Sequence, residues 1–219
     1  MDLETVIAQA PEVKPAEDER ASFYLENRGL IETWAALRAD AANIVVERLL
    51  DLAVPLSEDM RHLGEIDVEV GTSYSRGRPS VDLVRAGWRN AGLGSPVQIS
   101  LEAEQSAIGS RGSLQVFGCV RAKQGHPDAV RWHEPLAAVG PRLRAIMGRN
   151  WKSSLPRYVV WKYVDAPEDG WDLEAITLRA REELIRLWVA TAPVIDELMA
   201  AIAVIDGATE RGAGARTQN

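Results

Sequence analysis

Hydrophobic positions recur every three or four residues in one long segment near each end of the chain. From about Ser22, apolar side chains fall on one face of a helix that Pro55 is expected to end. They are Leu30, Trp34, Leu37, Ala41, Ile44, Val45, Leu49 and Leu52. A second stripe follows Asp172, a suitable N-cap, and Pro193 within it predicts a kink or a break near Ala192. Both ends are thus predicted to form long amphipathic helices.

Between these two segments, apolar and polar residues form runs of strand length. Strands are predicted at residues 66–70, 81–88, 97–105, 114–120 and 158–164. Short glycine-containing turns join the first four, which favours an antiparallel meander because a parallel crossover needs a much longer connection. Shorter helices are predicted at 57–63 and 133–147. Pro135 is expected in the first turn of the latter, and Gly140-Pro141 is expected to split it.

These elements predict one α+β domain over residues 22–206, with a largely antiparallel sheet of about four to five strands flanked by long N- and C-terminal helices. Residues 1–21 are predicted to be a mobile acidic arm, because Pro11 and Pro15 interrupt any helix there. Residues 207–219 lack an apolar period and are predicted to be a disordered tail.

Composition narrows the class of protein. The 219 residues are 46% hydrophobic, enough for the core of one ordinary domain. No apolar run is long enough to span a membrane, and the acidic first ten residues lack the basic start of a signal peptide, so a soluble, cytoplasmic protein is expected. A single cysteine, Cys119, excludes an internal disulfide, and three scattered histidines do not predict a zinc site. The Ala, Arg and Trp usage suggests a GC-rich bacterial genome.

Charge is segregated along the chain. Residues 1–70 hold 6 Lys and Arg against 16 Asp and Glu, whereas residues 121–162 hold 9 against 2. Two interpretations remain open. Acidic helices pack across a basic sheet region and neutralise it, or the basic middle forms a surface for an anionic partner, such as nucleic acid or an acidic protein.

The basic stretch interleaves cations with aromatic residues, a combination that suits base stacking and phosphate contact. Its candidate binding residues are Arg142, Arg144, Arg149, Trp151, Lys152, Arg157 and Lys162. Strand alternation places Tyr158 and Lys162 on one face and Trp161 on the other, where it is expected to be buried. Trp151 is the better candidate for an exposed aromatic side chain.

Three acidic residues fall on predicted strands and are candidate catalytic residues: Asp82, Glu102 and Glu104. Glu102 and Glu104 are two apart and share a face, and a neighbouring strand can bring Asp82 beside them. The order Pro79-Ser80-Val81-Asp82 followed by Glu102-Ala103-Glu104 resembles the PD-(D/E)XK nuclease superfamily, in the variant where glutamate replaces the lysine. The resemblance implies Mg²⁺ held by Asp82 and Glu102, with Glu104 in the lysine's place.

The same carboxylates also suit ordinary ion pairs with Arg85 and Arg89 across the sheet. The preferred hypothesis is therefore a non-catalytic module that binds nucleic acid or an acidic protein through the basic stretch and needs no cofactor. One alternative is a Mg²⁺-dependent nuclease. Another is a structural or regulatory protein that forms a homo-oligomer through its long helices. No membrane partner is expected.

Overall fold

A computed structural model describes residues 17–63, 66–73, 78–89, 94–108, 114–123, 126–127, 129–165 and 172–216. The chain divides into two compact units, residues 1–40 and 41–219. The boundary falls inside the first described helix, α2 (Glu17–Leu50), and within the span predicted to be a single domain. Residues 1–16 of the predicted arm lie outside the described residues, and residues 17–21 belong to α2.

Helix α2 differs from its prediction at both ends. It begins at Glu17, before Ser22, and ends at Leu50, before Pro55. Pro55 lies instead in the first turn of α3 (Ala53–Met60), where the missing N–H has no intrahelical acceptor to lose. The 3₁₀ turn η1 (Arg61–Leu63) follows, which confirms a short helical segment in this region.

The predicted apolar stripe of α2 is two stripes on different faces. Val45 and Leu49 are buried in the core, whereas Leu37 and Ile44 are exposed. Neighbouring positions on a helix lie about 100° apart, so Ile44 and Val45 cannot face the same surroundings.

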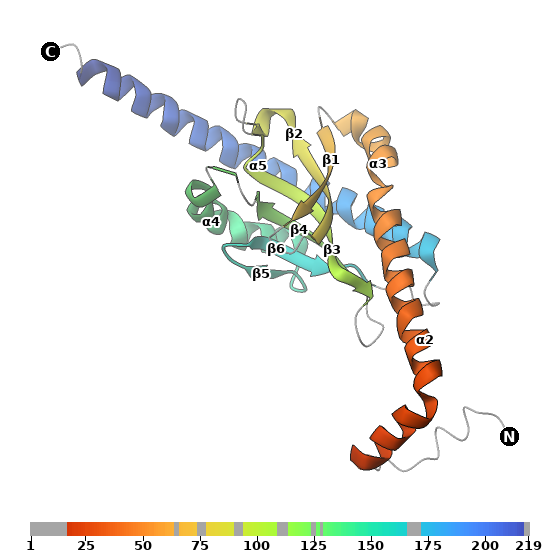
Figure 1. The fold of residues 1–219 in the computed structure, drawn as a ribbon. Coiled ribbons are helices and arrows are strands. Elements are labelled where there is room, and N and C mark those ends of the chain that lie inside the picture. Colours follow the sequence, from red (N-terminus) through yellow and green to blue (C-terminus); the bar gives the residue numbers. More distant parts are fainter. Residues whose placement is uncertain are drawn as a thin grey trace. The chain divides into compact units, whose positions relative to one another are not determined.

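Within the described residues, six strands form one antiparallel sheet, so the predicted fold class is confirmed. The spatial order is β1-β2-β3-β4-β6-β5, in which the first four strands are the predicted meander (Figure 1). The strands are β1 (Ile66–Ser73), β2 (Arg78–Arg85), β3 (Val97–Ile108), β4 (Leu114–Ala122), β5 (Lys152–Ser154) and β6 (Tyr158–Tyr163). The end of the predicted second strand is the 3₁₀ turn η2 (Ala86–Trp88), and three-residue β5 is an additional edge strand.

Helices α4 (Ala129–Met147) and α5 (Leu173–Arg216) pack on the sheet and on each other. Figure 1 shows α5 crossing behind the strands. The expected split at Pro141 is wrong, and Pro135 lies well beyond the first turn, because α4 begins earlier and is continuous. The expected break near Pro193 is also absent from α5. Burial of the residues around each proline offsets its cost of about 3 kcal/mol.

The ends of α5 give one confirmation and one difference. The Asp172 carboxylate accepts the backbone N–H of Glu174 at 3.1 Å, as expected for the predicted N-cap. The helix continues to Arg216, so residues 207–216, predicted to be part of a disordered tail, extend α5.

The sheet has two unlike faces. One face carries the apolar core, where it meets α3, α4, α5 and the last part of α2. Trp88 and Trp188 make a tilted ring contact there, with centroids 5.2 Å apart. The other face carries polar and aromatic side chains from β2, β3, β4 and β6, several of them fully buried. This second face holds the candidate site.

Candidate functional site

A buried ion triad joins three neighbouring strands on the second face. Arg121 of β4 lies between Asp82 of β2 and Glu102 of β3. Its Nε is 2.6 Å from Oε1 of Glu102, and its Nη2 is 3.1 Å from Oδ1 of Asp82. The three side chains are only 3%, 6% and 0% exposed, respectively. Charges this deeply buried are tolerated because they are paired and hydrogen-bonded.

Neutral side chains complete the surroundings of Asp82. Its Oδ2 accepts a hydrogen bond from Nε2 of Gln98 at 3.0 Å and from the hydroxyl of Ser80 at 3.3 Å. The Oε1 of Gln98 is buried and has no hydrogen-bond partner within the described part of the chain. Both flanking groups hold the Asp82 carboxylate in its orientation toward Arg121.

Glu102 connects the triad to the edge of the face. Its Oε2 accepts the hydroxyl of Tyr158 at 2.8 Å, and that hydroxyl accepts Nη1 of Arg78 at 3.1 Å. Arg78 then pairs with Glu104 at 2.5 Å. Acids and cations therefore alternate from Asp82 to Glu104, in an arrangement that ties β2, β3, β4 and β6 together.

Burial and the network together raise the pKa values of two neighbouring side chains, Cys119 and Tyr163. Burial raises the pKa of the Cys119 thiol well above its usual value, and the negative charge of Glu102 adds to the shift. The Cys119 Sγ lies 3.6 Å from Oε1 of Glu102. Burial, followed by the charge of Glu104, likewise raises the pKa of Tyr163. Cys119 is buried, as predicted, but it faces this polar network.

The three predicted catalytic carboxylates do not converge on one point. Asp82 and Glu102 both face the Arg121 guanidinium, and Glu104 faces Arg78 and the Tyr163 hydroxyl. Among the described residues, no group of three His, Cys, Asp or Glu side chains is arranged to hold a metal ion. The donor set as arranged therefore fits a structural ion network and does not fit Mg²⁺.

The arginines predicted to pair with these carboxylates are engaged elsewhere. Arg89 binds Asp67 and Glu69 of β1, at 2.8 Å and 2.7 Å. Arg85 lies 3.4 Å from Asp196 of α5. These pairs neutralise both arginines within the molecule.

A second site lies at the β5–β6 edge, beside four aromatic side chains in mutual contact. They are Phe117, Tyr158, Trp161 and Tyr163, mostly in edge-to-face geometry. Trp161 and Tyr163 are half-buried, so the expectation that Trp161 is buried is met only in part. A register shift in the pairing of β4 with β6 places Tyr158 on the same face as Trp161, contrary to simple alternation.

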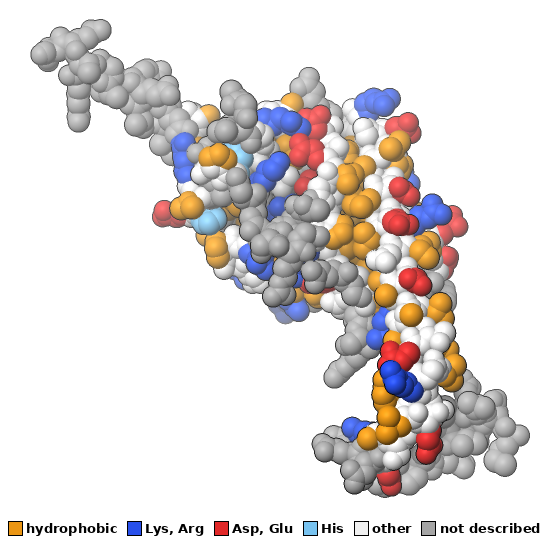
Figure 2. Space-filling view, in the orientation of Figure 1, with side chains coloured by type: hydrophobic (Ala, Val, Ile, Leu, Met, Phe, Trp, Pro, Cys, Tyr) orange, Lys and Arg blue, Asp and Glu red, His pale blue; other side chains and the backbone are white. Residues whose placement is uncertain are grey.

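An exposed cation lies over one of these rings. The Lys152 ammonium lies 5.1 Å from the centroid of the Trp161 ring, within cation–π range. Arg149 and Arg157, close to Lys152 in the chain, are also exposed. On the face drawn in Figure 2, acidic side chains gather over β1 and α3, and basic ones lie over the region of β5. We call Arg149, Lys152, Arg157, Trp161 and Tyr163 the β5–β6 surface.

The remaining predicted binding residues do not belong to this surface. Trp151 is buried at 4% exposure, so it is not the exposed aromatic side chain; its ring packs beside Gly118 and under Arg186. Arg142 is exposed but paired with Glu197 of α5. Lys162 is paired with Asp165 at 2.6 Å, and Arg144 is exposed on α4.

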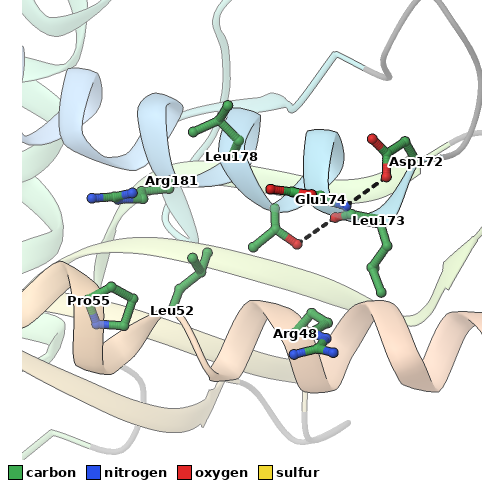
Figure 3. Close-up of a pocket in the computed structure, with 9 residues that line it drawn as sticks. Arg48, Leu52, Pro55, Asp172, Leu173, Glu174, Leu178 and Arg181 are labelled. Atoms are coloured by element: carbon green, nitrogen blue, oxygen red, sulfur yellow. Dashed lines mark hydrogen bonds between the residues drawn. The ribbon is translucent and has the colours of Figure 1, made fainter.

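A pocket of about 580 Å³ opens between the end of α2, α3 and the start of α5 (Figure 3). Apolar side chains, among them Leu52 and Leu178, form much of its wall. The lining also carries charges of both signs, from Arg48, Arg181, Asp172 and Glu174. The Arg181 guanidinium is held by Asp59, with Nε 2.7 Å from Oδ2. The volume and lining are of the kind that accommodates a small amphipathic molecule.

Comparison of the chain with protein-family models, with curated proteins and with solved structures found no match. Within the described residues, no helix combines the length and the apolar character that crossing a bilayer requires. The interpretation of the sites therefore depends on their own geometry.

Sequence reasoning missed the central member of the triad. In the sequence, Arg121 is only one member of the basic stretch 121–162, although it follows Phe117 and Cys119 at alternating positions of a largely apolar strand. A lone arginine on a buried strand signals a paired carboxylate on its neighbour. The pocket left no such signal, because residues from positions 48 and 181 meet only in the folded chain.

Proposed function

We propose that the protein binds single-stranded nucleic acid through the β5–β6 surface. The observation that carries the proposal is the Lys152 ammonium over the half-buried Trp161 ring, with the exposed Arg149 and Arg157 close to Lys152 in the chain. Aromatic faces accept unpaired bases of any sequence, and neighbouring cations bind the phosphates. An acidic protein would use the cations but would gain nothing from base stacking.

The arrangement of the hairpin supports this use. The indole N–H of Trp161 donates to the Ser154 hydroxyl at 3.0 Å, which fixes the ring against β5. The Tyr163 ring lies 5.4 Å from it in edge-to-face contact. A ring held in this way loses little conformational entropy when a base stacks on it.

The test is a fluorescence titration of labelled oligonucleotides with the full chain at two salt concentrations. Neutralising Arg149, Lys152 and Arg157 to Gln removes three cations and is expected to lower the magnitude of the salt slope by about 0.7 per lost phosphate contact. The matched control changes three exposed arginines elsewhere, Arg28, Arg61 and Arg179, to Gln. It removes the same charge and is expected to leave most of the binding.

Two results would contradict the proposal. Equal weakening by both triple variants would indicate a diffuse charge effect, and binding that does not respond to salt would exclude phosphate contact.

The same titration with Mg²⁺ tests the alternative of a nuclease. Cleavage that needs Mg²⁺ and is lost in Glu102→Ala would favour the carboxylates, provided that the variant remains folded.

A further inference from the structure

The first part of α2 carries an exposed apolar seam with the spacing of a coiled coil. Phe23, Leu30 and Leu37 are seven residues apart, and Trp34 lies four residues after Leu30 and three before Leu37. In the heptad notation abcdefg, the first three occupy d positions, and Trp34 and Asn27 occupy a positions. These apolar side chains are 52–63% exposed. Figure 2 shows hydrophobic side chains along this helix.

Apolar positions with this spacing pack best against a second helix. A strict alternation of three and four residues averages 3.5 per turn, which keeps the apolar positions facing a second helix that winds around the first. From Phe23 to Leu37 the seam is about 21 Å long. In the sequence the repeat continues with Ala41 and Ile44, so it covers more than three heptads.

We propose that α2 pairs with α2 of a second copy of the chain as a parallel, two-stranded coiled coil. Asn27 is the residue that favours this occupant and this direction. Within its own helix, each Asn27 side-chain amide donates one N–H to the Phe23 carbonyl at 2.9 Å, which leaves its second N–H and its oxygen. In a parallel pair in register, each a position meets its own counterpart, so these remaining groups of the two Asn27 amides can hydrogen-bond to each other. In an antiparallel pair, each Asn27 would face an apolar d residue and leave its amide poorly satisfied.

The flanking g and e positions are compatible with the same direction. Parallel pairing sets each g position against an e position of the other chain, so that Glu26 meets Ile31 and Thr33 meets Arg38. Neither contact opposes like charges. The inference is independent of nucleic-acid binding, because it uses none of the β5–β6 surface.

The test is the mass of the full-length protein by light scattering over a range of concentrations. A dimer of twice 24.0 kDa is expected. The double variant Leu30→Glu, Leu37→Glu is expected to be monomeric at concentrations where the wild-type chain is dimeric. The matched control, Ala35→Glu with Ala39→Glu, adds the same charges at exposed positions off the seam and is expected to remain dimeric. Circular dichroism checks that each variant stays helical.

Cysteine cross-linking tests the direction. Leu30→Cys at a d position is expected to form a disulfide-linked dimer under mild oxidation, whereas Ala35→Cys at a b position is not. The native Cys119 is fully buried and does not compete. A wild-type monomer at every concentration, or a dimer unaffected by the Leu30 and Leu37 changes, would overturn the proposal. A dimer in which Leu30→Cys fails to cross-link would overturn its parallel direction.

Discussion

Replacing Arg121 with Met tests the buried triad most directly. The substitution keeps much of the aliphatic volume but removes a guanidinium that lies 2.6 Å from Glu102 and 3.1 Å from Asp82. Both carboxylates then remain buried without their cation. Breaking a buried pair by removing one partner costs about 3–5 kcal/mol of unfolding free energy. Typical domains have only about 5–15 kcal/mol, so a large part of the stability would be lost.

Urea unfolding followed by tryptophan fluorescence measures this loss. At pH 7 the Arg121→Met variant is expected to unfold at a much lower urea concentration than the wild-type chain. Arg89→Met is the matched control, because Arg89 is 39% exposed in its ion pairs with Asp67 and Glu69, where such pairs contribute about 1 kcal/mol or less. The reasoning is refuted if the two variants lose similar amounts.

A compensating substitution gives an independent check of the cause. Adding Glu102→Gln removes one orphaned charge and is expected to restore part of the stability. A deficit that does not respond to this change would indicate lost packing of the arginine side chain instead.

Three further outcomes follow from single positions. Burial raises the pKa of the Cys119 thiol, so its contribution to stability is complete below the usual thiol value of 9.0 and is lost as pH rises above it. Above that pH, the unfolding free energy of Cys119→Ala should fall less steeply than that of the wild-type chain, and a thiol reagent should label the wild-type protein only after it unfolds. A methyl group added at Gly29, in the middle of α2, would have no other atom within 4 Å. Gly29→Ala should therefore stabilise that helix by about 0.5–1 kcal/mol and raise the melting temperature, and a lower melting temperature would contradict this prediction. Trp161→Ala should weaken single-stranded nucleic-acid binding by about 1–3 kcal/mol, measured in the same titration, and unchanged affinity would exclude stacking on this ring.

Local sequence pattern determined much of the fold, because turns, helix ends and strand alternation depend on interactions between near neighbours in the chain. Glycine-containing turns between strand-length runs predicted the meander, and Asp172 predicted the start of the last helix. The two-residue spacing of Glu102 and Glu104 predicted that both side chains would lie on one sheet face. The spacing of Leu30, Trp34 and Leu37 likewise predicted a helical stripe.

Only the tertiary structure decided what those faces meet. The register of β2, β3 and β4 sets Asp82 opposite Ser100 and Ser100 opposite Cys119, which brings Arg121 between two carboxylates. Such lateral neighbours are far apart in the chain, so no local pattern encodes them. Tertiary packing likewise keeps α4 continuous at Pro141 and buries Trp151. The free energy of packing exceeds the local preferences on which sequence prediction depends.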